Sequence, residues 1–132
     1  FAQADSLGVA RENYSLWGSS AGARMVAALG SGGVAAFGGD NLPKPSAVVM
    51  AYTGHSAFTK NDPPTFVTVG ENDRIVSVPV VEKRIDGMRR LGIDVEYRKY
   101  KNIGHGFGLG TGTEAEGWID NAIQFWGKYL KD

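Results

Sequence analysis

Three residues of the chain could together carry out acyl transfer, and the first of them is Ser20. It stands at the centre of Gly18-Ser19-Ser20-Ala21-Gly22, a G-x-S-x-G pattern. Glycines at these two positions allow a sharp turn from a strand into a helix, and such a turn exposes a serine hydroxyl for attack on a carbonyl carbon. We therefore expect Ser20 to be a nucleophile. The backbone N–H of Ala21 is the expected donor to the oxyanion that the attack creates.

A nucleophilic serine needs a base, and the base needs an acid that orients it. Asp73 follows the apolar run at residues 65–69, and His105 follows the run at residues 93–100. Because the carboxyl ends of parallel strands lie at one edge of a sheet, Ser20, Asp73 and His105 can converge although 53 and then 32 residues separate them. We expect His105 to act as general base and acid, and Asp73 to hold its tautomer.

Each of these residues also has a simpler interpretation. Ser20 could be a turn serine in a glycine-rich connection, and His105, which stands between glycines, could mark the turn of a loop. Asp73 could cap the helix that starts near Ser77, and Glu71 would then compete for the role of the acid.

Three further residues are expected to bind substrate. Ser19 adjoins the nucleophile, and Phe107 follows His105 closely enough to line a pocket for the acyl or the alcohol group. His55 follows the apolar run at residues 47–52 and so belongs at the same edge of the sheet. There it is a pocket wall more readily than a second catalytic histidine.

The hydrophobic pattern predicts the elements that must position these residues. Short apolar runs alternate with segments of helical period, which is typical of an α/β fold with a mainly parallel sheet and helices on both faces. Strands are expected at residues 14–17, 47–52, 65–69 and 93–100. Helices are expected at residues 21–29, 78–91 and 118–130, with a flexible loop at residues 30–41.

The last expected helix has the broadest apolar stripe. Its apolar and aromatic positions, which we expect to be core, are Trp118, Ile119, Ala122, Ile123, Phe125, Trp126, Tyr129 and Leu130. Thr113 and Glu116 stand just before it at the spacing of a capping box. Trp17 is likewise expected to be core and not a platform for a sugar.

Length and composition exclude several classes of function. The chain has 132 residues, which suits a single domain over residues 1–132, and its 14 basic and 14 acidic residues argue against nucleic acid as a partner. It has no Cys, which excludes disulfides and thiolate metal sites, and its two His leave little for a His-rich metal site. The longest apolar stretch, residues 47–52, is far shorter than the roughly 20 residues of a membrane span, so no membrane partner is expected.

With its order of Ser, acid and His, the chain resembles the α/β-hydrolase fold from Leu7 to Leu130. Gly18-Ser19-Ser20-Ala21-Gly22 looks like the nucleophile turn of the esterase and lipase branch. His105-Gly106-Phe107-Gly108-Leu109-Gly110, with the following Glu116-Gly117-Trp118, is similar to carbohydrate esterases of the acetyl xylan esterase and feruloyl esterase kind. The resemblance implies a serine carboxylesterase that hydrolyses short acyl esters, among them acetyl or feruloyl groups on polysaccharides, without metal or organic cofactor. It also implies a secreted or periplasmic protein if the substrate is a polysaccharide, and a cytoplasmic one otherwise.

The family has further strands and a glycine-rich oxyanion loop ahead of the nucleophile, where this chain has residues 1–13 only. We therefore expect a partial α/β-hydrolase three-layer sandwich, the C-terminal half of an esterase. Its first strand would then be an open edge, available to a second copy in a homo-oligomer or to the missing N-terminal half.

Two alternatives stay open. A serine peptidase of the prolyl oligopeptidase type shares the fold and the order of residues, but its nucleophile is usually followed by a bulky aromatic residue where this chain has Ala21. A non-catalytic interaction domain would keep the fold and lack the oxyanion loop. A glycine-rich loop upstream would favour the esterase over this last alternative.

Overall fold

A parallel sheet forms the centre of the computed structural model, which describes residues 1–39 and 41–130. The strands are β1 (Ser15–Ser19), β2 (Ala47–Ala51), β3 (Thr65–Gly70) and β4 (Val95–Tyr100). They lie side by side in their order along the chain, and each neighbouring pair is parallel. The four expected strands are confirmed, and β1 reaches two residues further than expected, as far as Ser19.

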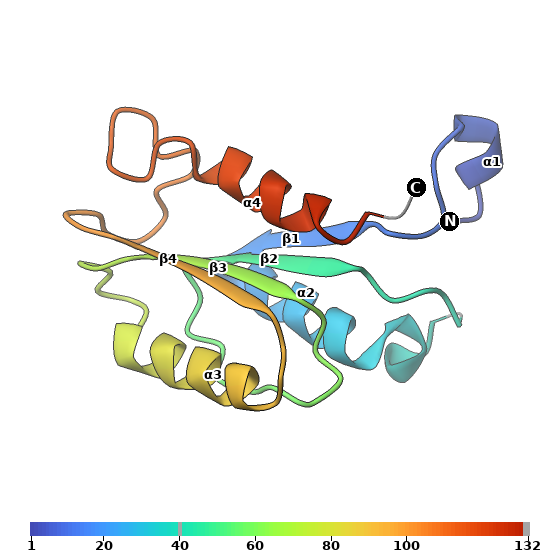
Figure 1. Ribbon diagram of the computed structural model, residues 1–132, viewed down its shortest axis with the longest axis horizontal. Helices are drawn as coiled ribbons and strands as arrows, with labels where there is room; N and C mark the ends of the chain where they lie inside the picture. The colour runs from blue at the N-terminus through green and yellow to red at the C-terminus, as the bar shows by residue number, and fades with distance from the viewer. Residues whose placement is uncertain (40, 131–132) are drawn as a thin grey trace.

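Helices cover both faces of this sheet (Figure 1). Two of them, α2 (Ala21–Gly32) and α3 (Val78–Arg90), lie on one face, and α4 (Trp118–Gly127) lies on the other. A short helix, α1 (Ala4–Leu7), precedes β1, and a 3-10 turn, η1 (Val34–Phe37), follows α2. The expected three-layer α/β arrangement with helices on both faces is therefore confirmed.

The composition of the central strands explains why helices pack on both faces of the sheet. Every residue of β2 and β3 is buried, as the continuous apolar runs indicated. Side chains alternate along a strand, so Val49 of β2 packs in the cluster with Phe125 of α4, while its neighbour Val48 packs with Ala27 of α2. A third cluster joins β3 and β4 to Ile85 of α3.

The prediction of a flexible loop at residues 30–41 is wrong for much of this segment. Helix α2 continues to Gly32, and η1 follows at once. Gly30 is buried in the helix, where an added Cβ would lie 2.7 Å from the Val48 side chain. This glycine serves the close packing of α2 on β2 and does not end the helix. Asp40 lies outside the described residues.

The capping box expected before the last helix is also wrong. Helix α4 begins at Trp118, because Gly117 just before it has a left-handed backbone (φ 86°) that a helical turn cannot include. The Thr113 hydroxyl instead donates to the carbonyl oxygen of Gly110 and accepts from the N–H of Ala115. Thr113 therefore organises the loop before α4.

The apolar stripe of α4 is only partly core. Trp118, Ala122 and Phe125 are buried, whereas Ile123 is 47% exposed. The helix also ends at Gly127, and Leu130 beyond it is exposed. The stripe is wider than the face of α4 that packs on the sheet, and Leu130 lies beyond the end of the helix. No helix within residues 1–39 and 41–130 has the length and hydropathy to cross a membrane.

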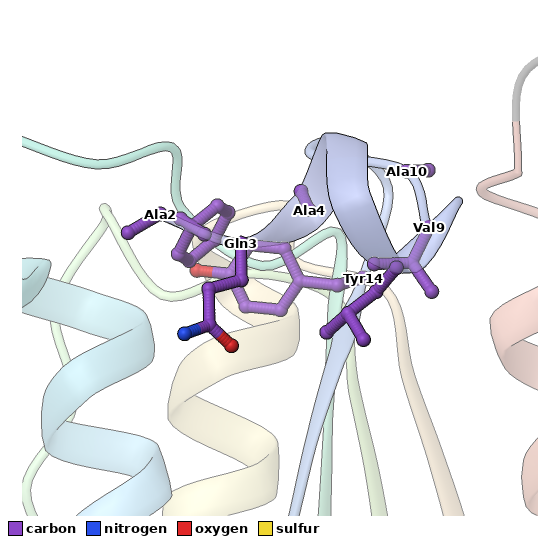
Figure 2. Close-up of a pocket in the computed structure, with 8 residues that line it drawn as sticks. Ala2, Gln3, Ala4, Val9, Ala10 and Tyr14 are labelled. Atoms are coloured by element: carbon purple, nitrogen blue, oxygen red, sulfur yellow. The ribbon is translucent and has the colours of Figure 1, made fainter.

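A cavity of about 540 Å³ lies between α1 and the residue that precedes β1 (Figure 2). Phe1 packs edge-on against Tyr14, with 5.1 Å between the ring centroids. Tyr14 immediately precedes β1, so this cavity lies at the amino ends of the strands. It is thus at the edge of the sheet opposite Ser20, and its lining is mainly apolar.

Candidate active site

Ser20 occupies the sharp turn between β1 and α2. Its backbone has φ 51° and ψ −120°, a conformation that costs a residue with a side chain about 1–3 kcal/mol. The turn is held because the Ser20 N–H donates to the carbonyl oxygen of Ala51 at 2.9 Å. A Cβ on Gly18 would lie 2.5 Å from the carbonyl oxygen of Gly22, whereas a Cβ on Gly22 would meet nothing within 4 Å. Of the two motif glycines, Gly18 is therefore the one that the packing requires.

Asp73 lies in the loop between β3 and α3, and its two carboxylate oxygens have separate partners. Oδ1 accepts from the N–H groups of Ile75 and Val76, both at 2.8 Å, and Oδ2 accepts from His105 Nδ1 at 2.8 Å. The side chain is fully buried. Ser77, not Asp73, stands at the N-cap of α3. The carboxylate thus orders its own loop with one oxygen and holds the histidine with the other.

A close backbone contact brings the acid loop to the histidine loop. Gly70 ends β3, and a Cβ there would lie only 2.2 Å from the carbonyl oxygen of Ile103. The same carbonyl oxygen accepts a hydrogen bond from the N–H of Asn72 at 3.0 Å. The glycine lets the two loops approach, and this places Asp73 beside His105.

His105 joins the acid to the serine. A neutral imidazole protonated on Nδ1 donates to Asp73 Oδ2, and its Nε2 accepts from the Ser20 hydroxyl at 3.1 Å. The structure therefore brings together Ser20, His105 and Asp73, from three connections at the carboxyl ends of β1, β4 and β3. A serine hydroxyl bonded in this way can pass its proton to the imidazole as it attacks, and the buried carboxylate can stabilise the imidazolium that forms.

Tyr52 packs against the histidine and was not singled out from the sequence. Its ring lies edge-on to the imidazole of His105, with 5.1 Å between centroids, and edge-on to Phe107 at 4.9 Å. Its backbone has a positive φ of 38°, which is rare for an aromatic residue. Only the position of Tyr52 at the end of β2 could have pointed to it.

A cavity of about 310 Å³ opens beside the serine and the histidine. Its lining residues are Ser20, Ala21, Arg24, Tyr52, Thr53, Gly54, Ile75, Val76 and His105. Ala21 is the first residue of α2, so its N–H is one of the helix groups without an intrahelical acceptor and is available to an oxyanion. Arg24, Ile75 and Val76 were not expected from the sequence, because only the tertiary fold brings them to this cavity.

The three expected substrate-binding residues do not line this cavity. Ser19 lines a neighbouring one of about 340 Å³, together with Trp17 and Leu109. Phe107 is half-buried in an aromatic cluster, edge-on to Tyr52. Trp17, expected to be core, is 36% exposed, because β1 is the edge strand of the described sheet.

His55 is half-buried in the loop after β2, where its backbone N–H donates to the Thr53 hydroxyl at 3.3 Å. Burial lowers the pKa of the His55 imidazole, and the positive charges of Arg84 and Arg24 lower it further, against the opposing effect of Asp62. His55 has no hydrogen bond to Ser20, whose partner is His105.

Comparison with protein families identifies the group to which the chain is related. Residues 38–132, which include Asp73 and His105, match the prolyl oligopeptidase family. The chain belongs to this family. The match fits the peptidase alternative in part, and its residues do not include Ser20 and Ala21. No curated protein matches the chain significantly in sequence.

Several solved structures of α/β hydrolases have the same fold as this prolyl oligopeptidase family member. MGS-M1, an α/β hydrolase enzyme from a Medee basin deep-sea metagenome library, matches with a TM-score of 0.79 at 20% identity, over 97% of this chain and 59% of its own. An acetyl ester-xyloside bifunctional hydrolase from Caldicellulosiruptor lactoaceticus matches with a TM-score of 0.79 at 15% identity, over 96% and 60%. Est2, a thermophilic esterase from Thermogutta terrifontis with propionate bound, matches with a TM-score of 0.80 at 17% identity, over 99% and 62%.

These likenesses establish the α/β-hydrolase fold of the family member. The chain spans about three fifths of the length of the structures that it matches. Among residues 1–39 and 41–130, no group of three or more metal-ligating side chains is gathered closely enough to hold a metal ion.

Proposed function

We propose that the chain carries the catalytic centre of a serine ester hydrolase, with Ser20 as nucleophile, His105 as general base and acid, and Asp73 as the orienting acid. The observation that carries this proposal is the continuous hydrogen-bonded series from the Ser20 hydroxyl through His105 to the buried Asp73 carboxylate. A surface serine in a glycine-rich turn has no reason to be aimed at an imidazole that is itself held by a fully buried carboxylate.

The reaction proceeds in two halves. His105 Nε2 takes the hydroxyl proton as Ser20 Oγ bonds to the ester carbonyl carbon, and the N–H of Ala21 donates to the resulting oxyanion. His105 then gives the proton to the leaving alcohol as the ester C–O bond breaks. Water repeats the sequence on the acyl-enzyme, so that the acid is released and Ser20 recovers its proton.

The substrate class that we favour is a short acyl ester, with acetyl or feruloyl groups on a polysaccharide as the specific form. The cavity beside Ser20 is close to the lower limit of ligand pockets, about 300 Å³. Two of the similar structures are described as an acetyl ester-xyloside hydrolase and a propionate-bound esterase. The stretch from His105 to Gly110, with its resemblance to carbohydrate esterases, supports the polysaccharide.

A serine peptidase is the second candidate, and the family match favours it. The same three side chains can cleave an amide, provided that His105 protonates a poorer leaving group.

Steady-state kinetics on both substrate classes distinguish the two candidates. The proposal expects hydrolysis of 4-nitrophenyl acetate and methyl ferulate that is lost in Ser20→Ala and falls about 10⁴-fold in Asp73→Asn, because Asn stabilises the wrong tautomer. Cleavage of a prolyl 4-nitroanilide without ester turnover would favour the peptidase. Ester turnover that survives in Ser20→Ala would overturn both candidates.

A further inference from the structure

Arg24 is the one strongly basic side chain that lines the cavity beside the nucleophile. Ser20 is the N-cap of α2, and Arg24 stands one helical turn further on. Residues so spaced lie on the same face of a helix, with about 5–6 Å between their Cβ atoms, and helical side chains lean toward the N-terminus. Arg24 therefore belongs to the side of α2 that carries the nucleophile, and it lines the same cavity as Ser20.

No protein group accounts for the position of this arginine. Within residues 1–39 and 41–130, Arg24 takes part in no ion pair or side-chain hydrogen bond, and it is exposed. Arg84 shows the contrast, since it is buried and bonded to the Asp62 carboxylate and the Ala57 carbonyl. The donors of Arg24 are thus available to a ligand that enters the cavity.

The surroundings of Arg24 favour a negative charge. None of the nine residues that line the cavity is acidic, and its opposite wall is the apolar pair Ile75 and Val76. The carboxylate nearest the site, Asp73, is buried behind His105 and already has three hydrogen bonds. The N-terminus of α2 adds partial positive charge beside Ser20.

The charge of Arg24 also extends toward His55. Burial has the largest effect in lowering the pKa of the His55 imidazole, and the positive charges of Arg84 and Arg24 lower it further. Arg24 of α2 therefore forms the basic side of the cavity, and Ile75 and Val76 of the loop before α3 form an apolar side.

We propose that Arg24 selects an ester that carries a carboxylate, on either its acyl or its alcohol part. A guanidinium binds a carboxylate through two parallel hydrogen bonds, and this geometry suits a group held a few bonds from the ester carbonyl at Ser20. This inference rests on the proposed function, because the carboxylate is recognised while Ser20 attacks the same molecule.

Two pairs of esters test the inference and distinguish the two positions of the charge. The mono-4-nitrophenyl ester of adipate is compared with 4-nitrophenyl hexanoate for a charge on the acyl part, and 4-acetoxybenzoate with 4-acetoxybenzamide for a charge on the alcohol part. For each pair, the ratio of kcat/KM for the charged ester to that for the neutral one is measured in wild type, Arg24→Gln and Arg24→Lys. Arg90→Gln is the matched control, since it removes the same charge from the last turn of α3, at the opposite edge of the sheet.

In one of the pairs the ratio is expected to fall about ten- to hundredfold in Arg24→Gln, the range of a hydrogen bond to a charged group. A smaller fall is expected in Arg24→Lys, which keeps the charge and loses the planar fork. The ratio is expected to stay at the wild-type value in Arg90→Gln. An equal fall in Arg90→Gln would overturn the inference, because net charge alone would then explain the preference.

Failure of this inference differs from failure of the proposed function. If the neutral esters are hydrolysed and both ratios are the same in wild type and Arg24→Gln, the selectivity is refuted and the esterase stands. If no ester is turned over by wild type, both are refuted. Protection of Ser20 from a fluorophosphonate by benzoate, but not by benzamide, provides a second readout, and equal protection by the two would also count against Arg24 as a carboxylate site.

Discussion

Replacement of Gly70 by Ala should separate the acid from the histidine. An added Cβ would lie 2.2 Å from the carbonyl oxygen of Ile103, where ordinary contact begins at 3.4 Å, so the two loops must move apart by about 1.2 Å. The groups that the Cβ would meet are the backbone carbonyls of Ile103 and Gly104, so no side chain can rotate away to relieve the clash. The shift falls on the hydrogen bond between Asp73 and His105, which is 2.8 Å long. A displacement of about 1 Å at a catalytic group can cost about 100-fold in rate.

The expected result for Gly70→Ala is a fall of about 100-fold in kcat/KM for 4-nitrophenyl acetate. Overpacking should also lower the free energy of unfolding by about 1–3 kcal/mol. Gly104→Ala is the matched control, because Gly104 immediately precedes His105 and an added Cβ would meet only the Asn72 carbonyl oxygen at 3.9 Å. Kinetics are measured at a temperature where circular dichroism shows both variants folded. Wild-type kcat/KM in Gly70→Ala, or equal damage in Gly104→Ala, would refute the reasoning.

Three further predictions concern stability. Asp62→Ala should lower the free energy of unfolding by about 3–5 kcal/mol in urea titrations, because it leaves the buried Arg84 without its counter-charge, and the added replacement Arg84→Met should recover part of this loss. The melting temperature should fall less in His55→Gln than in wild type when the pH is lowered from about 7.5 to about 5. The pKa of His55 is lower in the folded chain, so the unfolded chain binds more protons as the pH falls through 6.5, and this destabilises the wild type. Gly18→Ala should lower the free energy of unfolding by about 1–3 kcal/mol, because its Cβ clashes with the carbonyl group of Gly22. Gly22→Ala should leave this free energy unchanged or raise it by up to about 1 kcal/mol. The reverse order of the two variants would contradict the packing described for the turn.

The sequence predicts the parts of the fold that rest on local pattern. The fully buried strands β2 and β3 appear as continuous apolar runs, and the period of three and four residues predicts α3. The placement of Ser20, Asp73 and His105 at the ends of three strands follows from one rule, that parallel strands share their carboxyl edge. These features need no knowledge of which residues touch.

The parts that the sequence does not predict depend on contacts between distant segments. In the sequence, Gly70 indicates only the end of a strand, and its close approach to the Ile103 carbonyl is seen only in the fold. Gly30 likewise suggests the end of a helix, whereas its role is the contact with β2. Arg24 looks like one more exposed charge on α2, and only the fold places it beside His105 in the same cavity. The backbone of Tyr52 has a positive φ, and a tyrosine in the sequence gives no sign of such a conformation.

Active-site labelling of the chain with a fluorophosphonate, followed by mass mapping of the modified residue, tests the central claim most directly. If the hydrogen-bonded series activates the serine, Ser20 alone is labelled, and its labelling disappears in His105→Ala and slows strongly in Asp73→Asn. Wild type and variants must be folded by circular dichroism. Labelling of another serine, or equal labelling of Ser20 in His105→Ala, would contradict the account.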